Sequence, residues 1–168
     1  MSERNRTPYD YLVLATGAAP RVPAVCERRL PGVFVYRSAA DLRAIRHRAR
    51  RSSCAAVLGG GLLGLEAAAA LASLGLDTTV IEAGTHLLAR QLDAPSAALV
   101  AHELQRRGIA TLVDSCVRSI RQKDDRLVIE IDGGDERLGF EPLGEKIDGA
   151  HGEHLEVRGH PIFADVLE

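Results

Sequence analysis

Ala55-Ala56-Val57-Leu58-Gly59-Gly60-Gly61-Leu62-Leu63-Gly64 is a short apolar run that breaks into three glycines and continues as an alanine-rich segment. This pattern predicts a strand, a tight turn and the start of a helix. Gly59 permits the sharp turn, Gly61 lets the backbone approach a phosphate, and Gly64 lets the helix lie close to its strand. Free N–H groups and the helix dipole attract anions at such a turn. We therefore expect the whole turn, including Gly60, Leu62 and Leu63, to hold a dinucleotide pyrophosphate.

A second apolar run, Thr78-Thr79-Val80-Ile81, follows the helix and ends in Glu82. An acidic side chain about 20 residues after such glycines accepts hydrogen bonds from an adenosine ribose. Glu82 would also repel a 2′-phosphate, and Ala83-Gly84-Thr85-His86 offers no adjacent arginine to receive one. The expected cofactor is thus NAD(H) in preference to NADP(H). The alternative is a strand–helix–strand unit that binds nothing.

The composition is that of a soluble globular protein. The chain has 168 residues, 46% of them hydrophobic and 26% charged, which suits one domain with a real core. No apolar run approaches the ~20 residues of a membrane span, and the N-terminus lacks the apolar core of a signal peptide. A cytoplasmic location without membrane attachment is expected. Three distant cysteines, with no Cys-x-x-Cys, indicate reduced structural thiols.

Charge is unevenly distributed along the chain. Residues 1–51 hold eleven arginines against four acidic residues, whereas the remainder is net acidic. A basic segment can bind nucleic acid. Five of these arginines, however, surround one short predicted helix without interleaved aromatic residues and account for most of the net charge. A solvated helix face is therefore the better interpretation, and no nucleic-acid partner is expected.

The N-terminal part predicts two strands and a helix. The strands are Tyr9–Ala15, with Leu12-Val13-Leu14 buried on both sides, and Val33–Tyr36. Ser38-Ala39-Ala40-Asp41 has the form of a capping box and opens a helix near Ala39–Arg50. Leu42, Ile45 and Ala49 are expected to form its apolar stripe.

The central part predicts alternating strands and helices. In order they are strand Ala55–Leu58, helix Leu62–Leu74 stopped by Gly75, strand Thr78–Glu82, a helix capped by Asp93 and stopped by Gly108, and strand Ile109–Val113. The buried face of the helix after Asp93 is predicted to hold Leu99, Val100 and Leu104. This alternation predicts an α/β fold with a Rossmann-like, doubly wound parallel sheet.

The pattern changes after residue 113. Val117–Ile120 and Leu127–Ile131 resemble the strands of an antiparallel hairpin, with Lys123-Asp124-Asp125 at the turn and Glu130 pointing outward. A hairpin or meander crossover is therefore expected. Residues 132–160 predict a loop, and its His151, His154 and His160 are interpreted as loop histidines because no ligand geometry supports a metal site.

Four ordered motifs resemble a known family, the FAD-dependent pyridine nucleotide oxidoreductases. They are Tyr9–Pro20, which is similar to the family's ATG strand, Leu30–Leu42, Gly59–Ala68 and Leu87–Asp93. The glycine-rich and Gln-Leu-Asp motifs are most similar to those of the large subunit of assimilatory nitrite reductases. The resemblance covers about residues 9–131.

The resemblance implies roles for further residues. Glu66 matches a glutamate near the nicotinamide and flavin, with a partly buried structural acid as the alternative. Arg90 matches a position near the cofactor, although a surface arginine fits equally well. Thr16 and Gly17 match residues on the flavin side of the family's domain junction.

The resemblance also implies an organisation. Residues 1–37 would be the ATG strand and a linker from a flavin domain, 38–131 the NAD(P)H-binding core, and 132–168 an irregular segment with the start of a return strand at Phe163-Ala164-Asp165-Val166. The family's FAD phosphate loop is missing, so FAD is expected only in a full-length parent. The chain is expected to be an excised, by itself inactive, domain that partners a flavin domain and, in a nitrite reductase, iron–sulfur and siroheme modules. A ferredoxin or rubredoxin reductase, an NADH oxidase and a nucleotide-sensing module are the alternatives.

Overall fold

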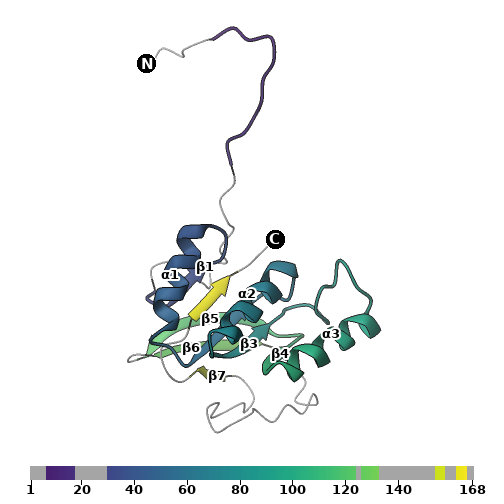
Figure 1. Ribbon diagram of the computed structural model, residues 1–168. Coiled ribbons are helices and arrows are strands. Elements are labelled where there is room, and N and C mark those ends of the chain that lie inside the picture. Colours follow the sequence, from purple (N-terminus) through teal and green to yellow (C-terminus); the bar gives the residue numbers. More distant parts are fainter. Residues whose placement is uncertain (1–6, 18–29, 124–125, 133–153, 158–161, 166–168) are drawn as a thin grey trace.

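A five-stranded parallel sheet forms the centre of the fold (Figure 1). The computed structural model describes residues 7–17, 30–123, 126–132, 154–157 and 162–165. The strands lie across the sheet in the order β1 (Val33–Val35), β8 (Ile162–Asp165), β2 (Cys54–Leu58), β3 (Asp77–Ile81) and β4 (Ile109–Leu112). All four neighbouring pairs are parallel, as predicted. β8, which includes Phe163, Ala164 and Asp165, is inserted between β1 and β2.

Three helices cover one face of this sheet. They are α1 (Ala39–Ala49), α2 (Leu62–Ser73) and α3 (Ala94–Arg106). Side chains alternate along β2, so that Ala55 and Val57 lie in the core cluster shared with the helices, whereas Ala56 and Leu58 lie in a separate cluster on the opposite face. Burial on both faces explains why the sequence of β2 is continuously apolar.

A smaller antiparallel sheet covers the second face. Its strands are β5 (Cys116–Lys123), β6 (Arg126–Asp132) and β7 (His154–Val157), in that order. Ile120, Leu127 and Ile129 of this sheet join the cluster of Ala56 and Leu58. The predicted hairpin and meander crossover is therefore confirmed, and the sheet is sandwiched between a helical layer and a β layer.

The prediction of an uninterrupted loop over residues 132–160 is wrong at residues 154–157. These residues form β7, which pairs antiparallel with β6 from Leu127↔Val157 to Glu130↔His154. The pairing satisfies backbone groups on the outer edge of β6, a tertiary contact that this four-residue segment does not reveal by itself. His151, His160, Asp124 and Asp125 lie outside the described residues.

Side-chain caps fix the starts of α1 and α3. Ser38 Oγ accepts from Asp41 N at 3.2 Å, and Asp41 Oδ2 accepts from Ser38 N at 2.8 Å, so the predicted capping box is confirmed. The hydrogen bond with the Ser38 side chain lowers the pKa of Asp41. Asp93 Oδ1 accepts from Ser96 N at 3.0 Å at the start of α3.

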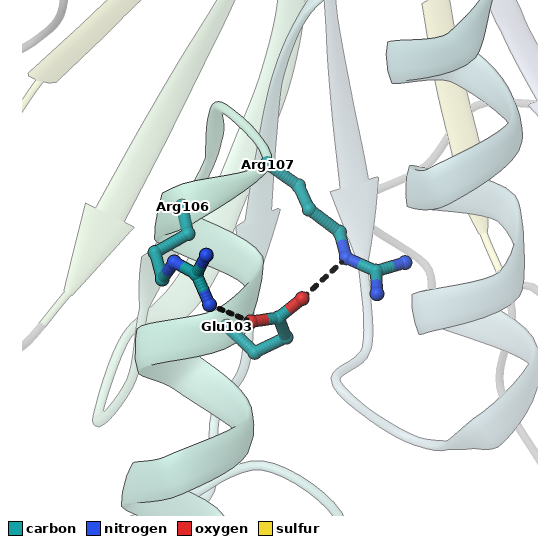
Figure 2. Close-up of polar contacts among 3 residues, drawn as sticks. All are labelled: Glu103, Arg106 and Arg107. Atoms are coloured by element: carbon teal, nitrogen blue, oxygen red, sulfur yellow. Dashed lines mark hydrogen bonds and ion pairs between the residues drawn. The ribbon is translucent and has the colours of Figure 1, made fainter.

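Charged residues close the last turn of α3. Figure 2 shows Glu103 between Arg106 and Arg107, with N···O distances of 3.1 and 2.8 Å. These exposed pairs add little stability. They place positive charge at the C-terminal end of α3, where the helix dipole favours it.

Two predicted core positions are exposed. Leu99 is 75% exposed, whereas the buried stripe of α3 runs through Ala97 and Leu104. Leu99 is two residues after Ala97, which is a rotation of about 200° around the helix axis, so it faces away from the sheet. Leu42 of α1 is 37% exposed, whereas Ile45 and Ala49 of the same predicted stripe are buried.

The strand predicted over Tyr9–Ala15 is not formed. Residues 7–17 have no regular secondary structure, and Leu12, Val13 and Leu14 are 58%, 83% and 80% exposed. An extended segment becomes a strand only by hydrogen bonding to a neighbour. No strand of the described residues pairs with this segment.

The described residues were searched for membrane-spanning helices and for groups of metal ligands. Among the described residues, no helix combines the length and the apolar character that crossing a membrane requires. Within the same residues, no three His, Cys, Asp or Glu side chains gather as metal ligands would. In the part of the chain that the structure describes, Cys54 and Cys116 form no disulfide bond.

Candidate functional site: a glycine turn at the carboxyl edge of the sheet

The turn between β2 and α2 combines a left-handed residue with an uncapped helix. Gly59 has φ +102°, a conformation that favours glycine, and its N–H donates to Ile81 O at 2.8 Å. Gly61 is the N-cap residue, and no side chain caps α2, in contrast to α1 and α3. The first N–H groups of α2 are therefore left for an external acceptor.

Gly64 allows the helix to approach the turn. A Cβ on Gly64 would lie 1.9 Å from Gly59 O and 3.0 Å from Gly59 C. Backbone thus meets backbone at this point, which only glycine permits. Leu62 and Leu63, between the glycines, are 56% and 43% exposed at the start of α2.

The Glu82 carboxylate lies beside the glycine turn. Glu82 directly follows β3; its Oε2 accepts from Gly60 N at 2.5 Å and its Oε1 from Gly84 N at 2.6 Å. The side chain predicted to meet a ribose therefore also ties two loops together, a role that the sequence did not reveal. The sequence feature that could have indicated this role is a carboxylate in the first position after a strand.

Residues 87–88 also contact Gly60. Leu88 N donates to Gly60 O at 2.9 Å, and a Cβ on Gly60 would lie 2.6 Å from Leu87 Cδ2. Leu87 is 1% exposed. The turn is thus fixed by the segment after β3 as well as by its own glycines.

Glu66, one turn into α2, pairs with a residue that sequence reasoning missed. Tyr36 Oη donates to Glu66 Oε1 at 3.2 Å, across 30 residues of sequence. Burial, and then the hydrogen bond and negative charge of Glu66, raise the pKa of Tyr36. Tyr36 was predicted as the last residue of the strand Val33–Tyr36, whereas β1 ends at Val35 and Tyr36 directly follows it. Glu66 is exposed, so it is not the partly buried structural acid that was the alternative interpretation of this residue.

The remaining candidates are Arg90, Thr16 and Gly17. Arg90 is exposed in the turn between β3 and α3. Thr16 and Gly17 lie in the exposed segment 7–17, where a Cβ on Gly17 would meet no heavy atom within 4 Å. The structure does not bring these two residues to the glycine turn.

The turn occupies a characteristic place in the sheet. The chain leaves β2 toward β3 on one side, whereas β8 and β1 lie on the other side of β2. β2 therefore lies in the middle of the sheet, and in open parallel sheets ligands bind outside the carboxyl ends of the strands. Gly59–Gly64, Glu82 and Tyr36 all follow strands at this edge.

Comparison with known proteins agrees with this geometry. The family described as "Pyridine nucleotide-disulphide oxidoreductase" matches residues 2–146. Over 130 residues, 77% of this chain, the sequence is 41% identical to the nitrite reductase [NAD(P)H] large subunit of Klebsiella oxytoca. Over 101 residues, 60% of this chain, it is 46% identical to the nitrite reductase (NADH) large subunit of Escherichia coli K12. These matches span only 14% and 12% of the two relatives.

A solved structure shows the same fold. The water-forming NADH oxidase of Lactobacillus brevis, bound to NADH, superposes with a TM-score of 0.71 at 19% identity, covering 90% of this chain and 29% of that protein. With the family match over most of its residues, the chain belongs to the pyridine nucleotide-disulphide oxidoreductases.

Proposed function

We propose that this chain is the NADH-binding domain of a flavoprotein reductase that passes hydride from NADH to FAD, with the large subunit of a nitrite reductase as the parent protein. The observation that carries the proposal is the uncapped start of α2 at the glycine turn, with the Glu82 carboxylate held beside it. Donors for a pyrophosphate and an acceptor for a ribose are the two features that dinucleotide recognition requires.

Different residues would bind different parts of the cofactor. The N–H groups at the start of α2 would bind the pyrophosphate, since they combine hydrogen bonds with the positive end of the helix dipole. Glu82 would accept from the adenosine ribose hydroxyls. Its anionic charge disfavours a 2′-phosphate, which favours NADH over NADPH.

Hydride transfer would need a flavin held by another part of the parent protein. The nicotinamide supplies the hydride, and the role of this domain is to bind and orient it. Thr16 and Gly17 would lie on the flavin side, and the exposed Leu12, Val13 and Leu14 are the kind of surface that a further sheet would cover. The domain alone is expected to bind nucleotide without oxidising it. In a nitrite reductase, electrons would continue through iron–sulfur and siroheme modules.

Calorimetric titration with NADH and NADPH tests the cofactor assignment. We expect NADH to bind at least tenfold more tightly, and Glu82→Ala to narrow the difference. Gly61→Val should abolish binding of both nucleotides, because a side chain would occupy the phosphate position. Glu103→Ala, which removes a carboxylate from the far end of α3, is the matched control. Equal or tighter binding of NADPH by the unmodified chain would contradict the role of Glu82.

The parent protein is tested by the flanking gene sequence. A nitrite reductase predicts an FAD fingerprint upstream and a cysteine-rich siroheme module downstream. An FAD fingerprint without the siroheme module would favour a ferredoxin or rubredoxin reductase or an NADH oxidase. Finding neither would defeat the flavoprotein assignment.

A further inference from the structure

The sheet order determines where the second half of a bound dinucleotide lies. The pyrophosphate site follows β2, and Glu82, the ribose acceptor, follows β3 on one side of it. A dinucleotide extends in both directions from its pyrophosphate. The nicotinamide half must therefore extend to the other side of β2, over the carboxyl ends of β8 and β1. This step rests on the proposed function.

Tyr36 and Glu66 lie together on that side. Tyr36 directly follows β1 and Glu66 belongs to α2, so their hydrogen bond of 3.2 Å spans the position of β8, which lies between β1 and β2. The Tyr36 ring packs against the core cluster beneath the helices, which anchors its hydroxyl. The raised pKa of Tyr36 keeps the phenol protonated, and thus a donor, throughout the neutral range.

Glu66 is exposed and therefore accessible to a ligand. On a helix surface, a free glutamate side chain samples several rotamers. The anchored hydroxyl of Tyr36 selects the rotamer in which Glu66 Oε1 accepts its hydrogen bond.

We propose that Tyr36 is a positioning residue that holds the Glu66 carboxylate beside the nicotinamide half of the dinucleotide, where the pair favours the oxidised cofactor over the reduced one. The oxidised pyridinium ring carries a positive charge and the dihydropyridine ring carries none. A carboxylate a few ångströms away stabilises the charged ring alone. The pair would thus set the relative affinities for NAD⁺ and NADH.

Three probes separate this role from a general structural one. NAD⁺, NADH and ADP-ribose, which lacks the nicotinamide ring, are titrated into the unmodified chain, Tyr36→Phe, Glu66→Gln and the double variant. We expect Glu66→Gln to weaken NAD⁺ binding about fivefold and Tyr36→Phe about threefold. NADH affinity should change less than twofold, and ADP-ribose affinity should not change. The double variant should equal Glu66→Gln, because Tyr36 acts through Glu66.

The control is Tyr11→Phe, which removes the hydroxyl of a tyrosine that is 94% exposed. It should leave all three affinities unchanged. Equal losses for ADP-ribose and NAD⁺ in Tyr36→Phe, an unchanged ratio of NAD⁺ to NADH affinity, or additive effects in the double variant would each overturn the positioning role. Failure of the unmodified chain to bind ADP-ribose would instead overturn the proposed function, and this inference with it.

Discussion

Replacing Gly64 by alanine tests the reasoning about the glycine turn most directly. The added Cβ would lie 1.9 Å from Gly59 O, whereas real Cβ atoms essentially never come closer than 3.0 Å to a neighbour. Both groups belong to the backbone, so no side chain can rotate away. The start of α2 must therefore move by about 1.1 Å or more relative to β2.

The expected cost follows from two opposing terms. Overpacking a close contact costs about 1–3 kcal/mol, and a shift forced on backbone belongs at the upper end of this range. Alanine gains about 0.5–1 kcal/mol over glycine within a helix. We therefore expect Gly64→Ala to lower the free energy of unfolding by about 2 kcal/mol, a roughly thirtyfold change in the equilibrium constant. NADH binding should fall with it, because the N–H groups of the turn move.

Urea denaturation followed by far-ultraviolet circular dichroism measures the first effect, since the chain has no tryptophan. Gly108→Ala is the matched control: Gly108 has φ +76° and no atom within 4 Å of an added Cβ. Left-handed strain should cost it about 1 kcal/mol without altering NADH affinity. The argument fails if Gly64→Ala unfolds within 0.5 kcal/mol of the unmodified chain and binds NADH as tightly.

Three further predictions concern stability, each measured by the same denaturation experiment. Ser38→Ala should cost about 1 kcal/mol by breaking the capping box. The pKa of Asp41 is lowered in the folded state, so its contribution is present above the ordinary aspartate pKa and lost as pH falls through the lowered value; the cost of Ser38→Ala should therefore shrink in acid. Leu99→Ala should change stability by less than about 0.5 kcal/mol, whereas Leu104→Ala should cost about 2–4 kcal/mol; comparable losses would show that the wrong face was taken as buried. Glu82→Gln leaves one oxygen for two backbone donors and should cost about 1 kcal/mol even without nucleotide, whereas no loss would mean that the loops hold their shape without the carboxylate.

Local patterns were sufficient where one segment's own chemistry decides its structure. The apolar run of β2, the glycines after it and the cap residues Ser38 and Asp93 each act through groups a few residues away. The sequence by itself therefore determined the order of the central strands and helices, the parallel sheet and the glycine turn.

Only the tertiary structure decided features that depend on distant neighbours. The segment 9–15 has strand-like residues, but no strand of the described chain pairs with it, whereas the four residues 154–157 become β7 because β6 offers an edge. Leu99 lies outside the buried stripe because the orientation of α3 on the sheet selects another face. The bonds from Tyr36 to Glu66 and from Gly60 to Glu82 join residues 30 and 22 positions apart. Periodicity reports which residues share a face of one element, and only packing between elements determines what that face meets.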